Sequence, residues 1–328
     1  MLTFHELHRA ALPGPTYVTI GNFDGLHLGH QALLIRAREL AAEDPSGSAQ
    51  TAMVTFDPHP ITVLRPERTL LKLTTPNERL ALAAALGVDV GVVHPFTEDT
   101  AQLSARDFVQ LLKDHLGLAG LVVGPDFALG RNRSGDIPTL RALGEELGYT
   151  VDIVEPVEWE GRPARSSTIR DLIARGDVAA AARLLGRSYS LSGPVQQGDQ
   201  RGRQIGIPTA NVGYAADKLL PANGVYATIS RLCTPGVLYA FASVTNVGVR
   251  PTVDGLHHRV EAHLLDFPPT ELPDDLYGQI LTVEFVERLR GEQRFEGLDQ
   301  LVAQIQRDIQ SARVIFAAEN GYSGLSAR

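Results

Sequence analysis

The first half of the chain alternates short apolar runs with helical patterns, and this alternation limits the folds open to it. The runs "YVTIG", "TAMVTF", "VDVGVVHPF" and "LAGLVVG" are rich in β-branched residues, and amphipathic stretches such as "ARDFVQLLKDHLG" separate them. Strands that alternate with helices form βαβ units, whose apolar strands are covered on both faces. We therefore expect an α/β domain with a parallel sheet and a ligand site beyond the carboxyl ends of its strands.

The pattern changes after about residue 186, where a second domain is expected to begin. From "YSLSGPVQQGD" to "LTVEFVERLR" the segments are short and strand-like, with Gly, Pro and Asn turns between them. They predict an antiparallel barrel or sandwich, and the last stretch predicts an amphipathic helix that packs against it. We place the first domain at 1–186 and the second at 187–328. The apolar stripe of the final helix consists of Leu298, Leu301, Val302, Ile305, Ile309, Ala312 and Ile315.

The composition narrows the classes of partner. A chain of 328 residues that is 44% hydrophobic can bury two cores, while a net charge of −8 argues against a broad surface for nucleic acid or anionic membrane. A small-molecule partner is expected. The single cysteine excludes an internal disulfide framework, and we find neither a signal-peptide pattern nor an apolar stretch of the roughly 18 residues that span a bilayer. We expect a cytoplasmic protein, whose oligomeric state the sequence does not predict.

The stretch "GNFDGLHLGH" carries the strongest chemical signal in the first half. It follows a predicted strand and precedes a predicted helix, so His27 and His30 would share one face at the helix start. The free N–H groups and partial positive charge there suit phosphate oxygens, and Gly21, Gly25 and Gly29 allow close approach of the backbone. The pattern predicts phosphoryl or nucleotidyl transfer. The alternative is that both histidines only cap the helix or are exposed.

The second half lacks the G-x-x-x-x-G-K-[ST] loop that many phosphate-binding proteins use. Its stretch "GDQRGRQIGIPTAN" offers another means of holding a nucleotide. Thr209 and Asn211 supply hard oxygen ligands of the kind that Mg²⁺ takes, although an ordinary Pro-Thr turn into a strand would look the same. A loop that could fold over a nucleotide would use the flexibility of Gly198, Gly202 and Gly206, with Arg203 as a possible charge and with Pro208 directly before Thr209 and Asn211.

Glu261 lies in the strand-like stretch "HRVEAHLLDF". Alternation along a strand puts Glu261, His263 and Leu265 on one face. From the residues alone, Glu261 is either an outward charge on a barrel strand or a functional carboxylate.

Together these motifs resemble a known family. "GNFDGLHLGH" resembles the G-x-F-D-x-x-H-x-G-H signature of the nucleotidyltransferase superfamily, and the chain resembles the bacterial bifunctional riboflavin kinase/FMN adenylyltransferases nearly end to end. Further matching segments are "TFDPHP", "VGPDFALGRNRSGD", "SSTIRDLIARGDV", "GDQRGRQIGIPTANV", "NGVYA", "VEAHLLDF" and "LYGQILTVEFVERLRGEQRF". The resemblance implies a Rossmann-like α/β nucleotidyltransferase domain with a parallel sheet, followed by an antiparallel β-barrel riboflavin kinase domain with a C-terminal helix.

For the first domain, the resemblance implies that His27 and His30 contact the ATP phosphates as AMP passes to the phosphate of FMN and pyrophosphate leaves. Because that phosphate is already a nucleophile, alignment and charge stabilisation are the enzyme's main tasks. The residues expected to line the nucleotide pocket are Gly21, Asn22, Phe23, Asp24 and Gly25. Those expected on the flavin side are Phe56, Asp57, His59 and Asp126, although "DPHP" is a rigid turn in any protein.

Two departures from the family pattern affect individual residues. The family usually reads S-S-T-x-[IV]-R, whereas "SSTIR" lacks one residue, so the hydroxyl positions are either 166–168 or 165–167. Arg170 matches in both alignments and is expected to contact phosphate, with Ser166 and Ser167 beside it. In "DFALG" the family commonly has an aromatic where Leu129 stands, which argues against flavin stacking at that position.

For the second domain, the resemblance implies that Thr209 and Asn211 hold Mg-ATP and that Glu261 is the general base. An alcohol is a poorer nucleophile than a phosphate, so the riboflavin 5′-hydroxyl needs a base to take its proton. We expect riboflavin and ATP to give FMN and ADP here, and FMN and ATP to give FAD and pyrophosphate in the first domain. The alternatives are a chain with only the kinase retained, a non-catalytic flavin-binding protein, and an RNA-binding relative of the class I synthetases, for which the chain lacks a basic stretch.

Overall fold

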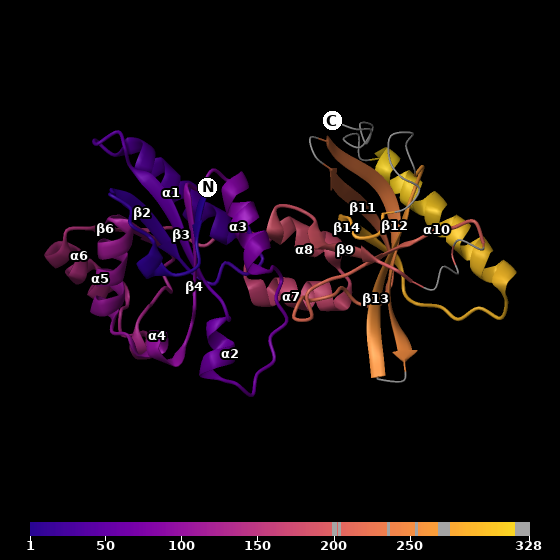
Figure 1. Ribbon diagram of the computed structural model, residues 1–328, viewed down its shortest axis with the longest axis horizontal. Helices are drawn as coiled ribbons and strands as arrows, with labels where there is room; N and C mark the ends of the chain where they lie inside the picture. The colour runs from indigo at the N-terminus through magenta and orange to yellow at the C-terminus, as the bar shows by residue number, and fades with distance from the viewer. Residues whose placement is uncertain (199–201, 203–204, 235–236, 253–254, 268–275, 319–328) are drawn as a thin grey trace. The chain divides into compact units, whose positions relative to one another are not determined.

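The computed structural model describes residues 1–198, 202, 205–234, 237–252, 255–267 and 276–318. The chain divides into two compact units, Met1–Ser166 and Ser167–Arg328 (Figure 1). The predicted boundary after residue 186 therefore stays a prediction, because the helices between 166 and 185 fall within the second compact unit.

The first unit is built on a six-stranded sheet in which every pairing is parallel. The strand order is β1-β4-β3-β2-β5-β6. The strands are β1 (Leu2–Phe4), β2 (Thr16–Ile20), β3 (Gln50–Phe56), β4 (Val90–His94), β5 (Leu118–Val123) and β6 (Thr150–Ile153), with a separate small hairpin of β7 (Glu158–Trp159) and β8 (Arg162–Pro163).

Helices cover both faces of this sheet, as the apolar strands predict. One core cluster joins α5 and α6 to the sheet through residues such as Phe108 and Leu140, and a second joins α1 and α3 through Leu34 and Leu80. The helices are η1 (Leu7–Arg9), α1 (Leu28–Glu43), α2 (Pro60–Leu64), α3 (Pro76–Ala85), α4 (Glu98–Gln102), α5 (Ala105–Leu116), η2 (Arg131–Arg133) and α6 (Ile137–Leu147).

The local sequence explains where these helices begin and end. In α5, the hydroxyl of Ser104 accepts from the N–H of Asp107, and Gly117 ends the helix with a φ of 62°. Phe108, Leu112 and Leu116 recur every four residues, so they share the face that packs against the sheet. The capping residues and the apolar periodicity therefore predict the same bounds for this helix.

The order of connections indicates the sheet edge at which ligands bind in folds of this kind. From β2 the chain continues to β3 and β4 on one side, whereas β5 and β6 lie on the other. The direction of winding thus reverses between β2 and β5, which makes the carboxyl ends at Ile20 and Val123 the topological switch point. The loop that carries the two histidines leaves the sheet at this point.

The second unit contains a closed antiparallel barrel with the order β10-β13-β12-β11-β14-β9. This confirms the predicted fold class for both halves. The barrel strands are β9 (Tyr189–Gln196), β10 (Ala210–Val212), β11 (Gly224–Thr234), β12 (Val237–Thr252), β13 (Gly255–Leu264) and β14 (Ile280–Arg290), and the helices are α7 (Ser166–Arg175), α8 (Val178–Leu185) and α10 (Leu298–Ala318).

The predicted apolar stripe of the last helix contacts the barrel at one end and lines a cavity at the other. Ala312 packs into a core cluster with Val225 and Val244 on the outer face of the barrel. At the other end of α10, Leu298 is 58% exposed, and Leu301 and Ile305 are half-buried around a cavity. Only part of the stripe therefore builds the core.

The two faces of the barrel differ in polarity. Ala227 and Ile229 face α10, so Thr228 of the same strand points into the barrel, where it is buried with Ser243 and Thr245. The Thr228 hydroxyl lies 2.6 Å from that of Thr245 and 2.9 Å from that of Ser243. These hydroxyls satisfy one another within the barrel.

Candidate active sites

In the first unit, the two motif histidines lie at the start of α1. His27 is the N-cap residue and only 6% exposed, and its Nδ1 accepts a 3.4 Å hydrogen bond from the backbone N–H of His30. The two imidazole rings stack with their centroids 3.6 Å apart. Gly29 permits this arrangement, because a Cβ there would lie 3.3 Å from the His27 ring. His27 therefore caps the helix as well as facing its partner.

His30 is partly buried, in an electropositive setting. Burial lowers the pKa of His30 well below its usual 6.5, and the nearby His27 and Arg79 lower it further. Its Nδ1 is buried and has no hydrogen-bond partner among the described residues. His30 is thus neutral at pH 7, with one ring nitrogen that no described residue satisfies.

The residues just before the histidines hold the loop in place. The carboxylate of Asp24 accepts from the backbone N–H groups of Leu73 (3.1 Å) and Thr74 (2.9 Å), and the Thr74 hydroxyl accepts from the N–H of Gly25 (2.8 Å). Phe23 is buried, with its ring edge toward His30 at 5.1 Å between centroids. Asp24 and Phe23 are therefore engaged in supporting the loop.

Backbone groups of the same loop are also occupied. The carbonyl oxygen of Asn22 accepts from Thr55 and Arg79, and the N–H of Gly21 donates to Val54. Gly25 has a φ of 84°, which a glycine adopts without strain. A nucleotide contact by Gly21, Asn22, Phe23, Asp24 or Gly25 stays a prediction.

The flavin-side candidates follow β3 and β5 at the same sheet edge. The ring of Phe56 contacts Phe96 edge-on at 5.4 Å between centroids. Asp57 pairs with Lys72 at 2.9 Å, and Nδ1 of His59 accepts from the N–H of Ile61 at the start of α2. Lys72 was not among the residues expected from sequence, because it lies in a loop without a motif.

The remaining candidates of this unit differ in exposure. The side chain of Asp126 is 87% exposed and lies 3.6 Å from Arg165. Leu129 packs against the core beside α5 and α6. This agrees with the expectation that Leu129, which replaces an aromatic residue of the family pattern, does not stack on a flavin. Ser166 donates to the carbonyl oxygen of Asp24 at 2.8 Å, which joins this hydroxyl to the histidine loop.

Two candidates of the "SSTIR" segment belong to the second unit. Ser167 is exposed and Arg170 is half-buried in the first turns of α7. Their contact with phosphate stays a prediction.

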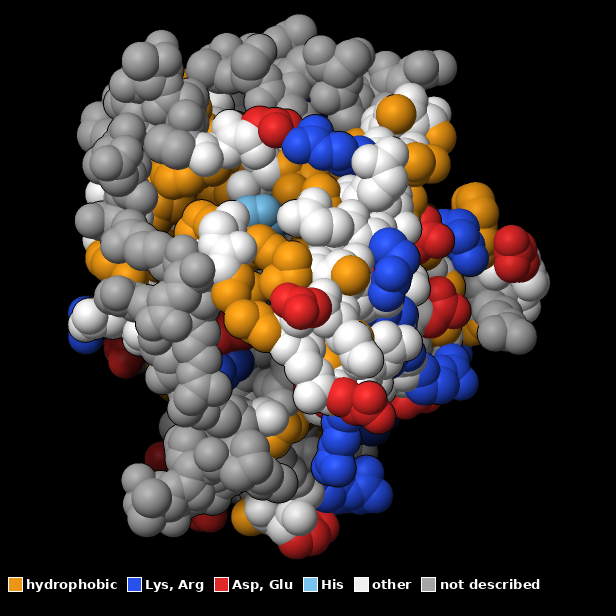
Figure 2. Space-filling model, turned by 90° about the vertical axis from the view of Figure 1, so that its right-hand side faces the viewer, with side chains coloured by type: hydrophobic (Ala, Val, Ile, Leu, Met, Phe, Trp, Pro, Cys, Tyr) orange, Lys and Arg blue, Asp and Glu red, His pale blue; other side chains and the backbone are white. Residues whose placement is uncertain are grey.

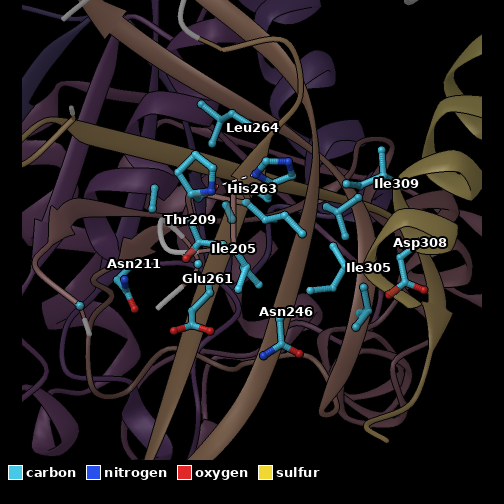
Figure 3. Close-up of a pocket in the computed structure, with 18 of the residues that line it drawn as sticks. Ile205, Thr209, Asn211, Asn246, Glu261, His263, Leu264, Ile305, Asp308 and Ile309 are labelled. Atoms are coloured by element: carbon cyan, nitrogen blue, oxygen red, sulfur yellow. Dashed lines mark hydrogen bonds between the residues drawn. The ribbon is translucent and has the colours of Figure 1, made fainter. Parts of the chain in front are cut away.

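In the second unit, a cavity of about 1330 Å³ lies between the outer face of the barrel and α10. On the face that carries α10, apolar side chains gather around a hollow (Figure 2). Three polar side chains line the cavity on adjacent strands (Figure 3): Asn211 of β10, Glu261 of β13 and Asn246 of β12. Glu261 is directly opposite Asn211 on one side and Asn246 on the other, so all three share one face.

The loop before β10 shapes one end of this cavity. A Cβ at Gly198 would overlap the amide of Asn211, and one at Gly202 would overlap the carbonyl oxygen of Ile207. Gly206 has a φ of 75°. Close packing at Gly198 and Gly202 and the positive φ of Gly206 explain why glycines recur in this stretch. Arg203 lies outside the described residues.

The polar groups beside Glu261 leave its carboxylate accessible. It is half-exposed, and one oxygen lies 3.7 Å from the Arg259 guanidinium. His263 on the same face donates from Nδ1 to the carbonyl oxygen of Pro208 at 2.7 Å, which ties β13 to the loop before Thr209. Thr209 is exposed in that loop.

Residues from α10 and β14 form the other wall. Ile305 and Ile309 present apolar side chains to the cavity (Figure 3). Behind them the buried Asp308 accepts from Arg290 at 2.8 Å and from Gln304 at 2.8 Å. One end of the cavity is therefore polar and glycine-rich, whereas the other combines the apolar Ile305 and Ile309 with paired charged groups.

Asn246 is the main residue of this cavity that sequence reasoning missed. Period-two alternation gives the face of each strand, but not which residue lies opposite Glu261. A signal was available, because β12 and β13 are consecutive strands of a hairpin. Counting residues back from their turn on both strands would have placed Asn246 opposite Glu261.

The chain matches two family models in succession, "FAD synthetase" over residues 10–168 and "Riboflavin kinase" over residues 185–316. It is 40% identical to a protein of Pseudomonas fluorescens, covering 91% of this chain and 92% of the relative. It is 37% identical to one of Escherichia coli K12 (95% and 96% covered) and 34% to one of Bacillus subtilis (95% and 97%). All three carry the name "Bifunctional riboflavin kinase/FMN adenylyltransferase".

A solved structure shares the whole architecture. It is titled "Crystal Structure of Macrolide-efflux Protein from Streptococcus pneumoniae" and superposes with a TM-score of 0.84 at 29% identity, covering 95% of this chain and 98% of that one. Among the helices in the described part of the present chain, none has the length and apolar character needed to cross a membrane.

Proposed function

Because the chain belongs to the bifunctional riboflavin kinase/FMN adenylyltransferase family, we propose how its two sites divide the synthesis of FAD. The enzyme phosphorylates riboflavin to FMN with ATP, and it transfers AMP from ATP to FMN to give FAD and pyrophosphate. We assign the adenylyl transfer to residues 1–186 and the kinase to residues 187–328.

The row formed by Asn211, Glu261 and Asn246 is the observation that carries the kinase assignment. In the proposed reaction, Glu261 accepts the proton of the riboflavin 5′-hydroxyl while the oxygen forms a bond to the γ-phosphorus of ATP. The bond from that phosphorus to the bridging oxygen breaks, and ADP leaves. A half-exposed carboxylate at the cavity wall can accept this proton and release it to water.

The donors at the polar end fit a magnesium ion. The Thr209 hydroxyl and the Asn211 side-chain oxygen are hard ligands, and two protein ligands leave positions for water and nucleotide oxygens. Gly198 provides the room in which the Asn211 amide lies. When bound, Mg²⁺ would offset the charge of the ATP phosphates. Gly202, Arg203, Gly206 and Pro208 are proposed to complete this nucleotide-binding end.

The two ends of the cavity suit the two substrates. Ile305 and Ile309 offer apolar contact for the flavin ring system, and the glycine-rich loop lies at the end where phosphates would meet Asn211. With this arrangement the 5′-hydroxyl of riboflavin would point toward Glu261. Asn246, opposite Glu261, is proposed to orient the hydroxyl or the base.

For adenylyl transfer, the unpartnered nitrogen of His30 at the start of α1 carries the assignment. An oxygen of the FMN phosphate attacks the α-phosphorus of ATP, and pyrophosphate leaves from the opposite side. His27, His30 and the free N–H groups of the helix start would stabilise the negative charge, and no base is needed. The other groups proposed here are Gly21, Asn22, Phe23, Asp24, Gly25, Ser166, Ser167 and Arg170 toward ATP, and Phe56, Asp57, His59 and Asp126 toward the flavin.

We also propose that the enzyme acts in the cytoplasm on small-molecule substrates alone. The net charge of −8 and the single cysteine support this setting.

A single incubation tests both assignments. The protein is mixed with riboflavin, ATP and Mg²⁺, and riboflavin, FMN and FAD are separated by chromatography over time. We expect FMN to appear before FAD, and a parallel incubation with FMN should release pyrophosphate. Accumulation of FMN without FAD would show that only the kinase is active, whereas retained riboflavin without products would indicate a flavin-binding protein.

A further inference from the structure

Arg79 is a fully buried arginine beside the histidine loop. It lies in α3 and is 1% exposed. A guanidinium is costly to bury unless its N–H groups find acceptors. Its position therefore calls for an explanation beyond the packing of α3.

One nitrogen of Arg79 connects two loops of the sheet edge. Nη1 donates to the carbonyl oxygens of Asn22 (2.9 Å) and Phe56 (3.2 Å) and to the Thr55 hydroxyl (2.8 Å). The Thr55 hydroxyl in turn donates to the carbonyl oxygen of Asn22 at 3.0 Å. Asn22 begins the loop that carries the histidines, and Phe56, which ends β3, is the first of the flavin-side candidates.

The charge of Arg79 also acts on the histidine pair. Together with burial and with the neighbouring His27, it lowers the pKa of His30, so the ring stays neutral. Phe23 contacts the His30 ring from the same loop, while the carboxylate of Asp24 is directed to the backbone at 73–74. A fixed positive charge behind the loop favours the negative charge that develops on transferred phosphates.

We propose that Arg79 is a positioning residue for adenylyl transfer: it fixes the ATP-side and flavin-side loops relative to each other and places a buried positive charge behind His30. It reaches the reaction through these groups and not by touching the substrates. This inference rests on the function proposed for the first unit.

The test compares three variants with one control variant in the full-length protein. Arg79→Gln removes the charge, Arg79→Lys keeps it without the planar guanidinium, and Thr55→Val removes the bridging hydroxyl with little change of shape. Arg38→Gln is the control, because Arg38 also donates to a carbonyl oxygen, that of Leu86, but on the exposed surface of α1. Rates of FMN adenylylation and riboflavin phosphorylation are measured on each preparation, with folding followed by circular dichroism.

We expect kcat for adenylylation to fall about 10²-fold in Arg79→Gln and about 10-fold in Arg79→Lys and Thr55→Val, with phosphorylation within twofold of wild type. Arg38→Gln should leave both rates unchanged. The pKa of His30, followed by NMR of histidine-labelled protein, should rise in Arg79→Gln and stay low in Arg79→Lys. A purely structural role would instead lower stability while leaving the rate per folded molecule and the His30 titration unchanged.

His30→Ala separates this inference from the function on which it rests. If His30→Ala loses adenylylation while Arg79→Gln and Thr55→Val, both folded, stay within threefold of wild type, the role of Arg79 is refuted and the site stands. If all of these variants adenylylate FMN normally, the proposed site itself is refuted. Should Arg79→Gln not fold, Arg79→Lys and Thr55→Val decide by the same criterion.

Discussion

The imidazole rings of His27 and His30 stack with their centroids 3.6 Å apart and their planes inclined by 21°. Two charged rings at this distance would repel strongly, which agrees with the lowered pKa of His30. In the role proposed here, His30 would therefore meet phosphate charge as a neutral N–H donor, aided by the helix start, rather than as a cation.

His30→Ala tests this role directly. Loss of one preorganised donor should slow FMN adenylylation by about 10²-fold or more. Riboflavin phosphorylation on the same preparation serves as the control and should continue. Near-normal FAD formation would mean that the motif only starts a helix.

The stability of the first unit should depend on pH through its buried histidines. Burial lowers the pKa of both His30 and His94 below the usual 6.5. Below pH 6.5 the unfolded state therefore binds protons that the folded state does not, so stability is full above this pH and falls as the pH drops.

Hydrogen exchange of the amides of β2 and β4, corrected for intrinsic rates at pH 7.5 and 5.5, measures this loss. The double variant His30→Gln, His94→Gln should flatten the dependence, whereas the exposed His5→Gln should not. If the stability of the double variant fell with pH as steeply as that of the wild type, the pH dependence could not be assigned to His30 and His94.

Glu261→Gln isolates the proposed base. The amide keeps the size of the side chain but cannot accept the proton, so kcat for riboflavin phosphorylation should fall about 10²- to 10⁴-fold with little change in binding. FMN adenylylation should continue. Glu287→Gln, an exposed glutamate on β14, is the matched control. A kinase rate within a few-fold of wild type would return Glu261 to the role of an outward strand charge.

Gly198→Ala tests the end of the cavity that is proposed to bind the nucleotide. The added methyl group would overlap the Asn211 amide, which must then move. We expect kcat/KM for phosphorylation to fall about 10-fold or more and the Mg²⁺ concentration for half-maximal rate to rise. Gly291→Ala is the control, since a methyl group there meets only an Arg288 nitrogen at 3.8 Å. Equal kinetics in the two variants would argue against Asn211 as a ligand.

Two fragments test the domain boundary. Residues 187–328 should fold and phosphorylate riboflavin unaided, because a barrel with its own helix can bury a core.

The longer fragment, residues 167–328, also contains α8, which packs against β9 and β14 and buries Leu184 and Leu185. Burial of two leucines is worth about 3 kcal/mol or more, so the longer fragment should melt roughly 10 °C higher. Equal melting temperatures would place α8 outside the barrel's core, and a folded but inert shorter fragment would show that the kinase needs residues before 187.

The elements that sequence predicts well are those whose signal is local. The apolar runs of the first half become buried parallel strands, and the glycine-rich turn before His27 becomes the start of α1. The short strand Leu2–Phe4 was not expected, because "MLTFHELHR" has no apolar run and the strand forms through its pairing with β4.

The contacts within the sites depend on residues far apart in the chain. Period-two alternation places Glu261 and His263 on one face, but only strand register brings Asn246 and Asn211 beside Glu261. In the same way, the sequence of α3 gives no sign that Arg79 would reach Asn22. Sequence therefore predicts the chemistry of single residues better than the neighbours that support them.

The hydrogen bonds that the Asp24 carboxylate accepts from the N–H groups of Leu73 and Thr74 close a loop of about 50 residues, and this span has a consequence for the order of folding. The entropy of closing such a loop must be offset before these bonds contribute, so the sheet contacts of β3 must already be in place. The hydrogen-bonded conformation of the histidine loop, in which adenylyl transfer is proposed to occur, then forms late, after the strands that it connects have docked. A newly made chain would acquire its fold before its capacity to adenylylate FMN.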